Sequence, residues 1–333
     1  METDKQQYHM ADLTTPYLGL KLRNPLVVSS SGLADSADKV KKIAEAGAGA
    51  VVLKSLFEEQ INYEAGRMIE DDAYPEAADY IKNYTRDHSL DEYLRLIENS
   101  RKQAGIPVIA SINCISNGDW IDFAKQIESA GADALELNTF ILPIDGGAPE
   151  RIEQAYFDLL TRVRSVVSIP LAVKISPYFS NLIYMISRFY ALGINGVVMF
   201  NRLYEPDIQI EEMKMTTAEV FSNPADLRQT LRWISLAFDR YKGINLSAST
   251  GIHSGESLIK VLLAGAQTGQ VCSALYKGGL TVIDEMIADL EKWMDDHEFD
   301  SIDEFRGRMS YRDYENARIW ERSQFMRYFS SRH

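Results

Sequence analysis

The chain has 333 residues, 46% of them hydrophobic, which is enough for one large domain or two smaller ones. With 35 Lys and Arg against 48 Asp and Glu, the net charge of −13 would repel nucleic-acid phosphates and anionic membranes. The N-terminus predicts no signal peptide, no apolar run reaches the roughly 18 residues of a membrane span, and two cysteines cannot form a disulfide framework. We expect a cytoplasmic, enzyme-sized protein with no membrane or nucleic-acid partner.

One helix-to-strand junction recurs four times along the sequence. In each copy, small residues and a glycine follow an amphipathic segment, and an apolar run comes next; the glycines are Gly47, Gly131, Gly193 and Gly265. Glycine in the left-handed conformation ends a helix at low cost, and a short turn can then lead into a strand. The four junctions indicate a repeating unit of strand and helix.

Eight short apolar runs predict strands that are buried on both faces of a parallel sheet. Segments of helical length lie between them, such as 119–130. Eight such units predict an α/β fold, the TIM (β/α)8 barrel. A doubly wound sheet is the alternative, but its usual G-x-G-x-x-G after the first strand is absent. The predicted strands are 26–32, 49–57, 107–114, 134–140, 170–176, 196–201, 245–250 and 269–274.

Two segments fall outside the repeat. A polar insertion of about residues 58–92 follows the second strand, within a barrel domain predicted over residues 1–300. Residues 301–333 alternate aromatic and charged side chains, which predicts a helical extension that packs on the barrel or on the partner in a homodimer.

In a TIM barrel the reactive groups lie at the C-terminal ends of the strands. In this sequence those ends carry two lysines, Lys54 and Lys174, and three asparagines, Asn113, Asn138 and Asn201. They carry neither the carboxylate pair of a glycosidase nor a histidine cluster for a metal, so we predict no metal site. Amides and fixed cations suit a flat heteroaromatic ligand such as a flavin. Each residue also has a plainer interpretation, because asparagine often serves only a turn.

The clearest local signal is a glycine-bearing loop, Thr250 to Glu256, between the seventh strand and a helix that we expect to begin at Ser254. Barrels commonly bind a phosphate at the loops after strands seven and eight. Cys272 and Ser273, at the end of the eighth strand, would complete this phosphate site.

Several segments in this order resemble the dihydroorotate dehydrogenase family, in its soluble, class 1-like branch. The resemblance covers most of residues 13–310 and rests on NPLVVSSSGL (24–33), AGAGAVVLKS (46–55), VIASINC (108–114), ADALELN (132–138), LAVKISPYF (171–179), GVVMFN (196–201), STGIHSGESLIKVLLAGA (249–266) and QVCSALYKGG (270–279). It implies an FMN-dependent oxidoreductase of pyrimidine biosynthesis that oxidises dihydroorotate to orotate by hydride transfer to flavin N5.

The resemblance also implies residue roles. Lys174 would neutralise the negative charge that develops at N1 and O2 of the reduced flavin. Lys54 would meet the substrate carboxylate, which makes it a catalytic residue as well. The implied cofactor ligands are Ser31, Gly32, Lys54, Ser55, Asn113, Asn138 and Lys174 along the ring system, and Thr250, Gly251, Cys272 and Ser273 at the phosphate. The implied substrate ligands are Lys54, Asn138, Asn201 and Arg202.

The chain departs from the family pattern at the catalytic base. Where the family has a Cys or Ser three residues beyond the asparagine of strand four, this chain has Ile141, which cannot take a proton, and Pro143 replaces a second asparagine. A positioned base typically contributes 10² to 10⁴ in rate. Cys114, Thr139 and Tyr204 are the candidates for a substitute base.

Two further departures concern the substrate. The family's N-S-M-G-L-type loop is absent from 58–92, and Arg202 stands where a small hydroxyl residue is usual. Three functions therefore stay open: dihydroorotate oxidation, turnover of another small, anionic, unsaturated substrate, and FMN binding without turnover. The sequence contains no iron–sulfur cysteine set, which leaves fumarate or a partner flavoprotein as electron acceptor.

Overall fold

A computed structural model describes residues 11–57, 61, 63, 78–113, 120–141, 144, 146–202 and 205–312. Within these residues, eight parallel strands close into a barrel, because the last strand pairs with the first. The TIM barrel predicted from the sequence is therefore confirmed, with each strand inside or next to its expected range. The strands are β3 (Leu26–Val28), β4 (Ala50–Val52), β6 (Val108–Asn113), β7 (Ala134–Asn138), β8 (Leu171–Ile175), β9 (Gly196–Met199), β12 (Asn245–Ser249) and β13 (Thr268–Val271). A short strand, β5 (Leu56–Phe57), adds a second pairing to β6.

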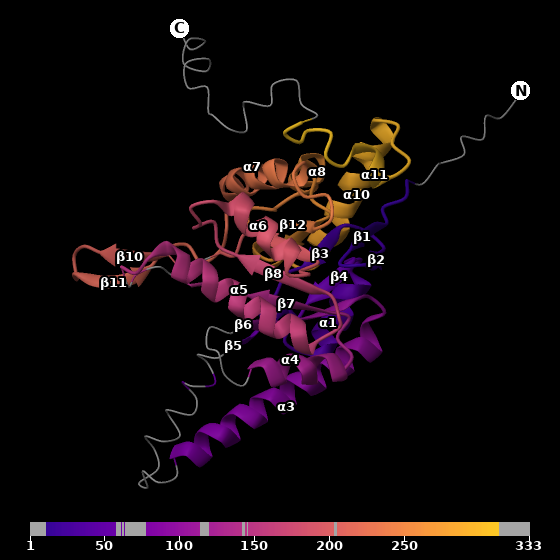
Figure 1. Cartoon of the computed structure of the whole chain (residues 1–333). Coiled ribbons are helices and arrows are strands. Elements are labelled where there is room, and N and C mark those ends of the chain that lie inside the picture. The colour runs from indigo at the N-terminus through magenta and orange to yellow at the C-terminus, as the bar shows by residue number, and fades with distance from the viewer. Residues whose placement is uncertain are drawn as a thin grey trace, which may run out of the picture.

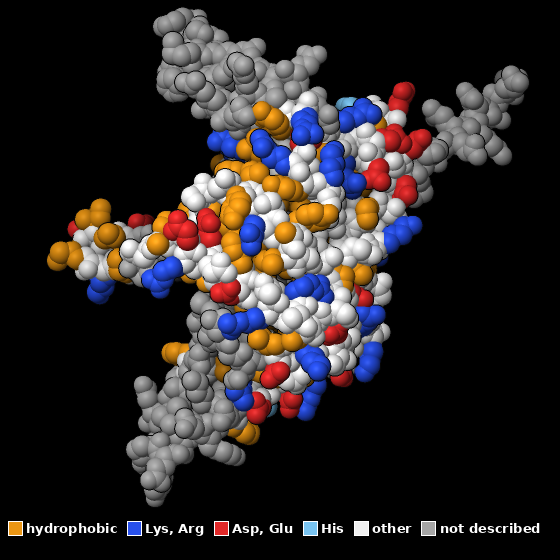
Figure 2. Space-filling view, in the orientation of Figure 1, with side chains coloured by type: hydrophobic (Ala, Val, Ile, Leu, Met, Phe, Trp, Pro, Cys, Tyr) orange, Lys and Arg blue, Asp and Glu red, His pale blue; other side chains and the backbone are white. Residues whose placement is uncertain are grey.

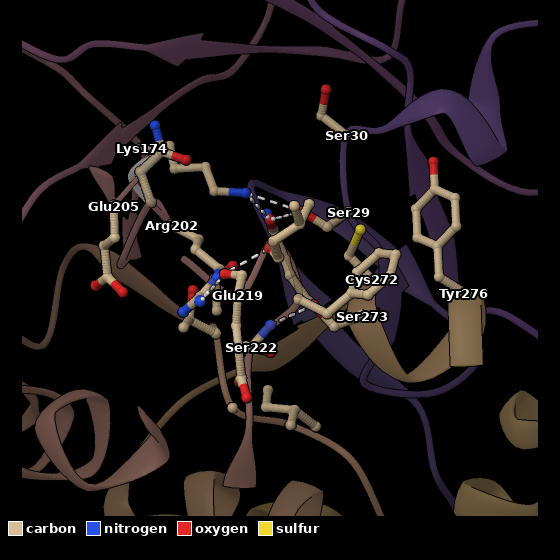
Figure 3. Close-up of a pocket in the computed structure, with 18 of the residues that line it drawn as sticks. Ser29, Ser30, Lys174, Arg202, Glu205, Glu219, Ser222, Cys272, Ser273 and Tyr276 are labelled. Carbon is tan, nitrogen blue, oxygen red and sulfur yellow. Dashed lines mark hydrogen bonds between the residues drawn. The ribbon is translucent and has the colours of Figure 1, made fainter. Parts of the chain in front are cut away.

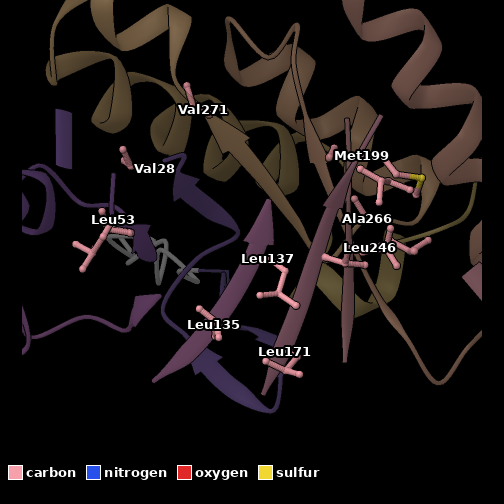
Figure 4. Packing of buried hydrophobic residues seen from close by; sticks show 14 of the residues in the cluster. Val28, Leu53, Leu135, Leu137, Leu171, Met199, Leu246, Ala266 and Val271 are labelled. Carbon is pink, nitrogen blue, oxygen red and sulfur yellow. The ribbon is translucent and has the colours of Figure 1, made fainter. Parts of the chain in front are cut away.

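Helices surround the barrel (Figure 1). They pack on alternate strand residues that point outward, such as Leu135, Leu137 and Val271 (Figure 4). The main helices are α1 (Ala37–Glu45), α3 (Ala78–Ala104), α4 (Trp120–Ser129), α5 (Pro149–Val166), α6 (Leu182–Ala191), α7 (Leu227–Phe238), α8 (Gly255–Ala264) and α10 (Thr281–Asp296). Shorter helices are η1 (Gly32–Ala34), η3 (Pro224–Asp226), α9 (Ser273–Gly278) and α11 (Ile302–Phe305).

The four junction glycines have the left-handed backbone that the sequence predicted. Their φ angles are 103° at Gly47, 91° at Gly131, 78° at Gly193 and 117° at Gly265. The helix expected at Ser254 is α8, and the Ser254 side chain accepts a hydrogen bond from the Ser257 backbone N–H as its N-cap. The junction glycines and the Ser254 N-cap thus determine where these helices end and begin.

The amino end of the barrel is closed by the hairpin of β1 (Thr15–Tyr17) and β2 (Leu20–Leu22). Its turn residue Leu18 and the neighbouring Tyr17 are buried against inward-facing apolar residues of the strands. The Leu18 backbone N–H donates to the Asn245 side chain, 2.6 Å away. A Cβ atom on Gly196 would lie 2.5 Å from Leu18 Cδ2, so the absence of a side chain there makes room for the turn.

The two segments outside the repeat are only partly described. Part of the predicted insertion, 58–60, 62 and 64–77, lies outside the described residues, and from Ala78 onward the chain forms the first half of α3. In the C-terminal extension, Ile302 and Phe305 are fully buried against the barrel helices, and residues 313–333 lie outside the described part. No helix among the described residues is both long and apolar enough to cross a membrane.

A hairpin that the sequence did not reveal stands away from the barrel (Figure 1). It consists of β10 (Pro206–Gln209) and β11 (Lys214–Thr217), and every residue of both strands is exposed. Ile208, Met213 and Met215 are among its exposed apolar side chains. Hydrophobic side chains are visible in orange on the hairpin in Figure 2.

We predict that Gly265→Ala destabilises the protein by more than Gly105→Ala. Both glycines have positive φ, and an alanine there costs about 1–2 kcal/mol. Only at Gly265 would the added Cβ meet the Phe238 ring, which adds about 1–3 kcal/mol of overpacking. Urea unfolding of both variants measures the difference, and equal losses would contradict the packing argument.

Candidate functional site

A cavity of about 550 Å³ opens at the carboxyl ends of β3, β8, β9, β12 and β13 (Figure 3). This is within the range of small-molecule and cofactor sites. Seven residues singled out in the sequence lie in its lining: Lys174, Asn201, Arg202, Thr250, Gly251, Cys272 and Ser273. The lining also contains residues that the sequence analysis did not select: Ser29, Ser249, Ile252, Gln270, Tyr276, Glu205 and the segment 218–222.

Lys174 lies at the floor of the cavity and is only 5% exposed. Its Nζ donates to Ser29 Oγ at 2.8 Å and to Gln270 Oε1 at 3.0 Å (Figure 3). An ammonium group has three hydrogens, so one remains for a ligand once the acceptors among the described residues are counted. Ser29 and Gln270 were missed because the strands were interpreted as continuous apolar runs. Their signal was the polar residue at every second position, where the side chains face the barrel interior.

The loops after β12 and β13 meet at one end of the cavity. Thr250 and Gly251 have φ angles of 76° and 83°, and a Cβ on Gly251 would collide with the Leu227 backbone. Thr250 Oγ1 donates to the Phe200 carbonyl at 2.9 Å, which holds the loop against β9. Burial raises the pKa of the neighbouring Cys272 thiol, which therefore stays neutral. These loops occupy the place where barrels commonly bind a phosphate.

One wall of the cavity is the segment 218–222, which Arg202 holds in place. The guanidinium donates through Nε to the Val220 carbonyl at 3.1 Å and through Nη2 to the Glu219 carbonyl at 2.7 Å. Its Nη1 lies 3.0 Å from Asp226 Oδ2. Arg202 is thus occupied by its own chain, and its predicted contact with substrate stays a prediction.

The far end of the same wall is fixed at Ser222. Its carbonyl accepts from Lys277 Nζ at 3.1 Å, and its backbone N–H donates to Ser273 Oγ at 3.0 Å. Its hydroxyl lies 2.9 Å from His253 Nε2. Burial, assisted by the charge of Lys277, lowers the pKa of His253, so the imidazole is neutral at neutral pH.

The predicted amides lie near each other at the barrel mouth. Asn201 Nδ2 donates to Asn138 Oδ1 at 2.8 Å, and Asn138 is buried at the end of β7. Asn113 Oδ1 is buried and has no hydrogen-bond partner in the described part of the chain. The Thr139 hydroxyl donates to the Lys174 carbonyl at 3.3 Å, so it is already used by the backbone.

Lys54 lies beside the main cavity, in a second hollow of about 220 Å³ that it shares with Asp35, Glu92 and Tyr93. The two cavities are neighbours, because Ser30 lines the first, Ser55 lines the second, and their hydroxyls are 3.0 Å apart. The structure therefore places Lys54 next to the cavity that contains Lys174 and not in it.

The remaining predicted residues lie at the cavity edge, against the core, or outside the described part of the chain. The Ser31 hydroxyl accepts from the Leu33 backbone N–H at the start of η1, and a Cβ on Gly32 would lie 3.1 Å from Tyr276 Oη at the cavity edge. The Ile141 backbone N–H donates to Tyr156 Oη, and its side chain packs against the outer core. Cys114, Pro143 and Tyr204 lie outside the described residues.

Comparisons with known proteins agree on one family. Residues 12–294 match the family model described as dihydroorotate dehydrogenase. Among similar curated proteins, the dihydroorotate dehydrogenase B (NAD(+)) catalytic subunit of Thermoplasma acidophilum is 28% identical, over 90% of this chain and 99% of its own. The protein of the same name from Staphylococcus carnosus is 26% identical over 90% and 98%. The NAD-dependent dihydropyrimidine dehydrogenase subunit PreA of Escherichia coli is 24% identical over 89% and 76%.

We predict that Arg202→Met loosens the cavity wall. Each lost hydrogen bond to the charged guanidinium contributes about 1.5–3 kcal/mol, so protease cleavage within 205–222 should become about tenfold faster or more. Limited proteolysis followed by mass spectrometry measures this rate. Arg228→Met is the control, because Arg228 is exposed on the neighbouring helix; equal cleavage of the two variants would contradict the role of Arg202.

Proposed function

Because the chain belongs to the dihydroorotate dehydrogenase family of flavin-dependent oxidoreductases, we propose that it binds FMN and oxidises dihydroorotate to orotate. The observation that carries this proposal is the buried Lys174 at the floor of the main cavity, with one ammonium hydrogen left for a ligand. A buried cation that is not fully hydrogen-bonded by the protein suits a ligand that becomes negatively charged.

The residues present fit FMN. The cavity joins Lys174 at its floor to the loops of Thr250 and Ser273, as an elongated ligand with a phosphate at one end requires. Asn113 Oδ1 is buried and has no partner among the residues that the structure describes, which suits a ring N–H donor. In this proposal the ring system would contact Ser31, Gly32, Ser55, Asn113, Asn138 and Lys174, and the phosphate would contact Thr250, Gly251, Cys272 and Ser273.

Oxidation of dihydroorotate removes a hydride and a proton from adjacent carbons. FMN supplies the hydride acceptor when it is bound. Lys174 would stabilise the negative charge that such a transfer brings to the floor of the cavity. Lys54, in the adjoining hollow, would bind the substrate carboxylate, and the Asn138–Asn201 pair offers amide groups to the substrate ring.

The proton needs a base, and the described residues make some candidates weaker than others. The Ile141 side chain has no site for a proton, and the Thr139 hydroxyl is directed at the Lys174 carbonyl. We therefore propose Cys114, the residue that follows β6 in the sequence, as the base; like Tyr204, the other remaining candidate, it lies outside the described residues.

A second candidate function is the oxidation or reduction of another small, anionic, unsaturated substrate by the same flavin. Ile141 favours it, because an apolar residue at the family's base position points to different proton chemistry. The name of PreA, a dihydropyrimidine dehydrogenase subunit, shows that a relative of this chain acts on another reduced pyrimidine.

We also propose a partner for the electrons. The names of the relatives from Thermoplasma acidophilum and Staphylococcus carnosus describe catalytic subunits that use NAD(+). A second, flavin-containing subunit is therefore our proposed acceptor, in preference to fumarate. A homodimer of this chain and its place in the cytoplasm stay predictions of the sequence.

We predict that dihydroorotate bleaches the flavin absorbance of the FMN-loaded protein under anaerobic conditions. Stopped-flow absorbance measures the reaction, and dithionite is the control for a reducible flavin. If dithionite bleaches the flavin and dihydroorotate does not, while dihydrouracil does, the second function replaces the first. Purified protein that neither contains FMN nor takes it up would remove both.

We predict that Ile141→Cys accelerates dihydroorotate oxidation, by about tenfold to 100-fold, because a positioned base contributes 10² to 10⁴ in rate and an introduced one is imperfectly placed. Ile141→Val is the matched control, since it changes the packing without adding a protonatable group. Single-turnover reduction of the flavin measures both variants. Equal rates would mean that the absence of a base at position 141 does not limit the reaction, because another residue such as Cys114 already supplies one.

A further inference from the structure

A carboxylate lies inside the barrel below the cavity, and the mechanism above does not use it. Glu136, in the middle of β7, is completely buried. Its Oε2 accepts a hydrogen bond from Gln270 Nε2 at 2.7 Å, whereas its Oε1 has no hydrogen-bond partner within the described residues. Burial of a carboxylate is costly unless a positive charge compensates it.

The compensating charge is Lys174. Its Nζ lies 3.8 Å from Glu136 Oε1, and both side chains are almost fully shielded from water. This separation leaves Coulomb attraction without a direct hydrogen bond, so the ammonium keeps its third hydrogen for the cavity. The carboxylate therefore compensates the lysine charge without competing for the ligand.

Gln270 joins the two ends of this pair. Its Oε1 accepts from Lys174 and its Nε2 donates to Glu136. An ammonium group only donates and an ionised carboxylate only accepts, so this single orientation of the amide satisfies both. The arrangement thus matches a charged lysine and a charged glutamate.

The neighbouring phenols do not provide a charge. Burial raises the pKa of Tyr17 and of Tyr93 well above the usual value, and the negative charge of Glu136 raises both further. Both are therefore neutral, and Lys174 is the cation that Glu136 meets among the described residues.

We propose that Glu136 is a positioning residue: it is the buried counter-ion that compensates the charge of Lys174 at the floor of the cavity, and it thereby raises the reduction potential of FMN bound there. The proposal rests on the proposed function in so far as it needs FMN in the cavity. A buried ammonium group without a counter-ion is costly, because burial disfavours the charged form. A neutral amine could not stabilise the negative charge of a reduced ligand.

The first test is the midpoint potential of bound FMN in E136Q, K174M and the double variant. E136Q keeps the shape of the side chain. We expect reduced FMN to lose about tenfold in affinity relative to oxidised FMN, which lowers the potential by about 30 mV for a two-electron couple. K174M should shift it similarly, and the double variant no further. T268V is the control, because it removes a buried hydrogen bond of the barrel interior without a charge, and it should leave the potential unchanged.

The direction of the change in midpoint potential in E136Q distinguishes between two roles of Glu136. Loss of a carboxylate that acted directly on the flavin would raise the potential, since a negative charge near the ring disfavours reduction. An unchanged or raised potential in E136Q, or additive shifts in the double variant, would overturn the proposal.

The second test does not need the cofactor. In FMN-free protein, K174M leaves Glu136 buried without a counter-ion, and we expect the melting temperature to fall by about 5 °C or more. Addition of E136Q to K174M should recover at least half of this loss, and additive losses would overturn the pairing. If E136Q alone fails to fold, a folded double variant supports the pairing and an unfolded one overturns it. Wild-type protein that does not bind FMN would refute the proposed function, and this test would still judge the ion pair.

Discussion

The charged pair of Lys174 and Glu136 inside the barrel is the interaction on which the candidate site depends. Opposite charges in a protein interior lose their hydration, and their mutual attraction offsets this cost only when other hydrogen bonds complete the network. Here β13 supplies Gln270 between them, and Ser29, just after β3, supplies a further acceptor for the lysine. The network uses four strands, β3, β7, β8 and β13, and they must keep their register for it to exist, so the site needs the closed barrel.

The residues that face the barrel interior change from apolar to polar along the strand direction. At the amino end it is filled by apolar side chains such as Val27, Ile109 and Val198, with Tyr17 and Leu18 packed below them. On several strands the inward position two residues further along is polar, as at Glu136 after Ala134 and at Lys174 after Ala172. Because side chains alternate along a strand, one face of each strand passes from core to site within a few residues. The amino-terminal part of each strand therefore contributes to the core, and the carboxyl-terminal part of the same strands contributes to the site.

The sequence was sufficient for the parts of this structure that depend on local chemistry. Glycines after helices, short apolar runs and the N-cap at Ser254 each act within a few residues, and together they identified the barrel. The role of Glu136 could not be predicted, because nothing near it in sequence reveals that Gln270, 134 positions away, would hydrogen-bond to it. The position of Lys54 in a separate hollow and the contacts of Arg202 with 219–220 likewise depend on how loops fold over the mouth. Such contacts depend on tertiary packing, so no periodic pattern in the sequence predicts them.

The hairpin of β1 and β2, which closes the amino end of the barrel, has a consequence for how reactants reach the site. Tyr17 and Leu18 close the amino end of the barrel. The main cavity and the hollow of Lys54 both open at the carboxyl end, so small molecules that react near Lys174 enter and leave at that end. A small substrate enters by this opening, whereas the proposed electron-accepting subunit is too large for a cavity of about 550 Å³. That subunit must therefore receive the electrons from outside the cavity, so the substrate and the electron acceptor do not compete for one place.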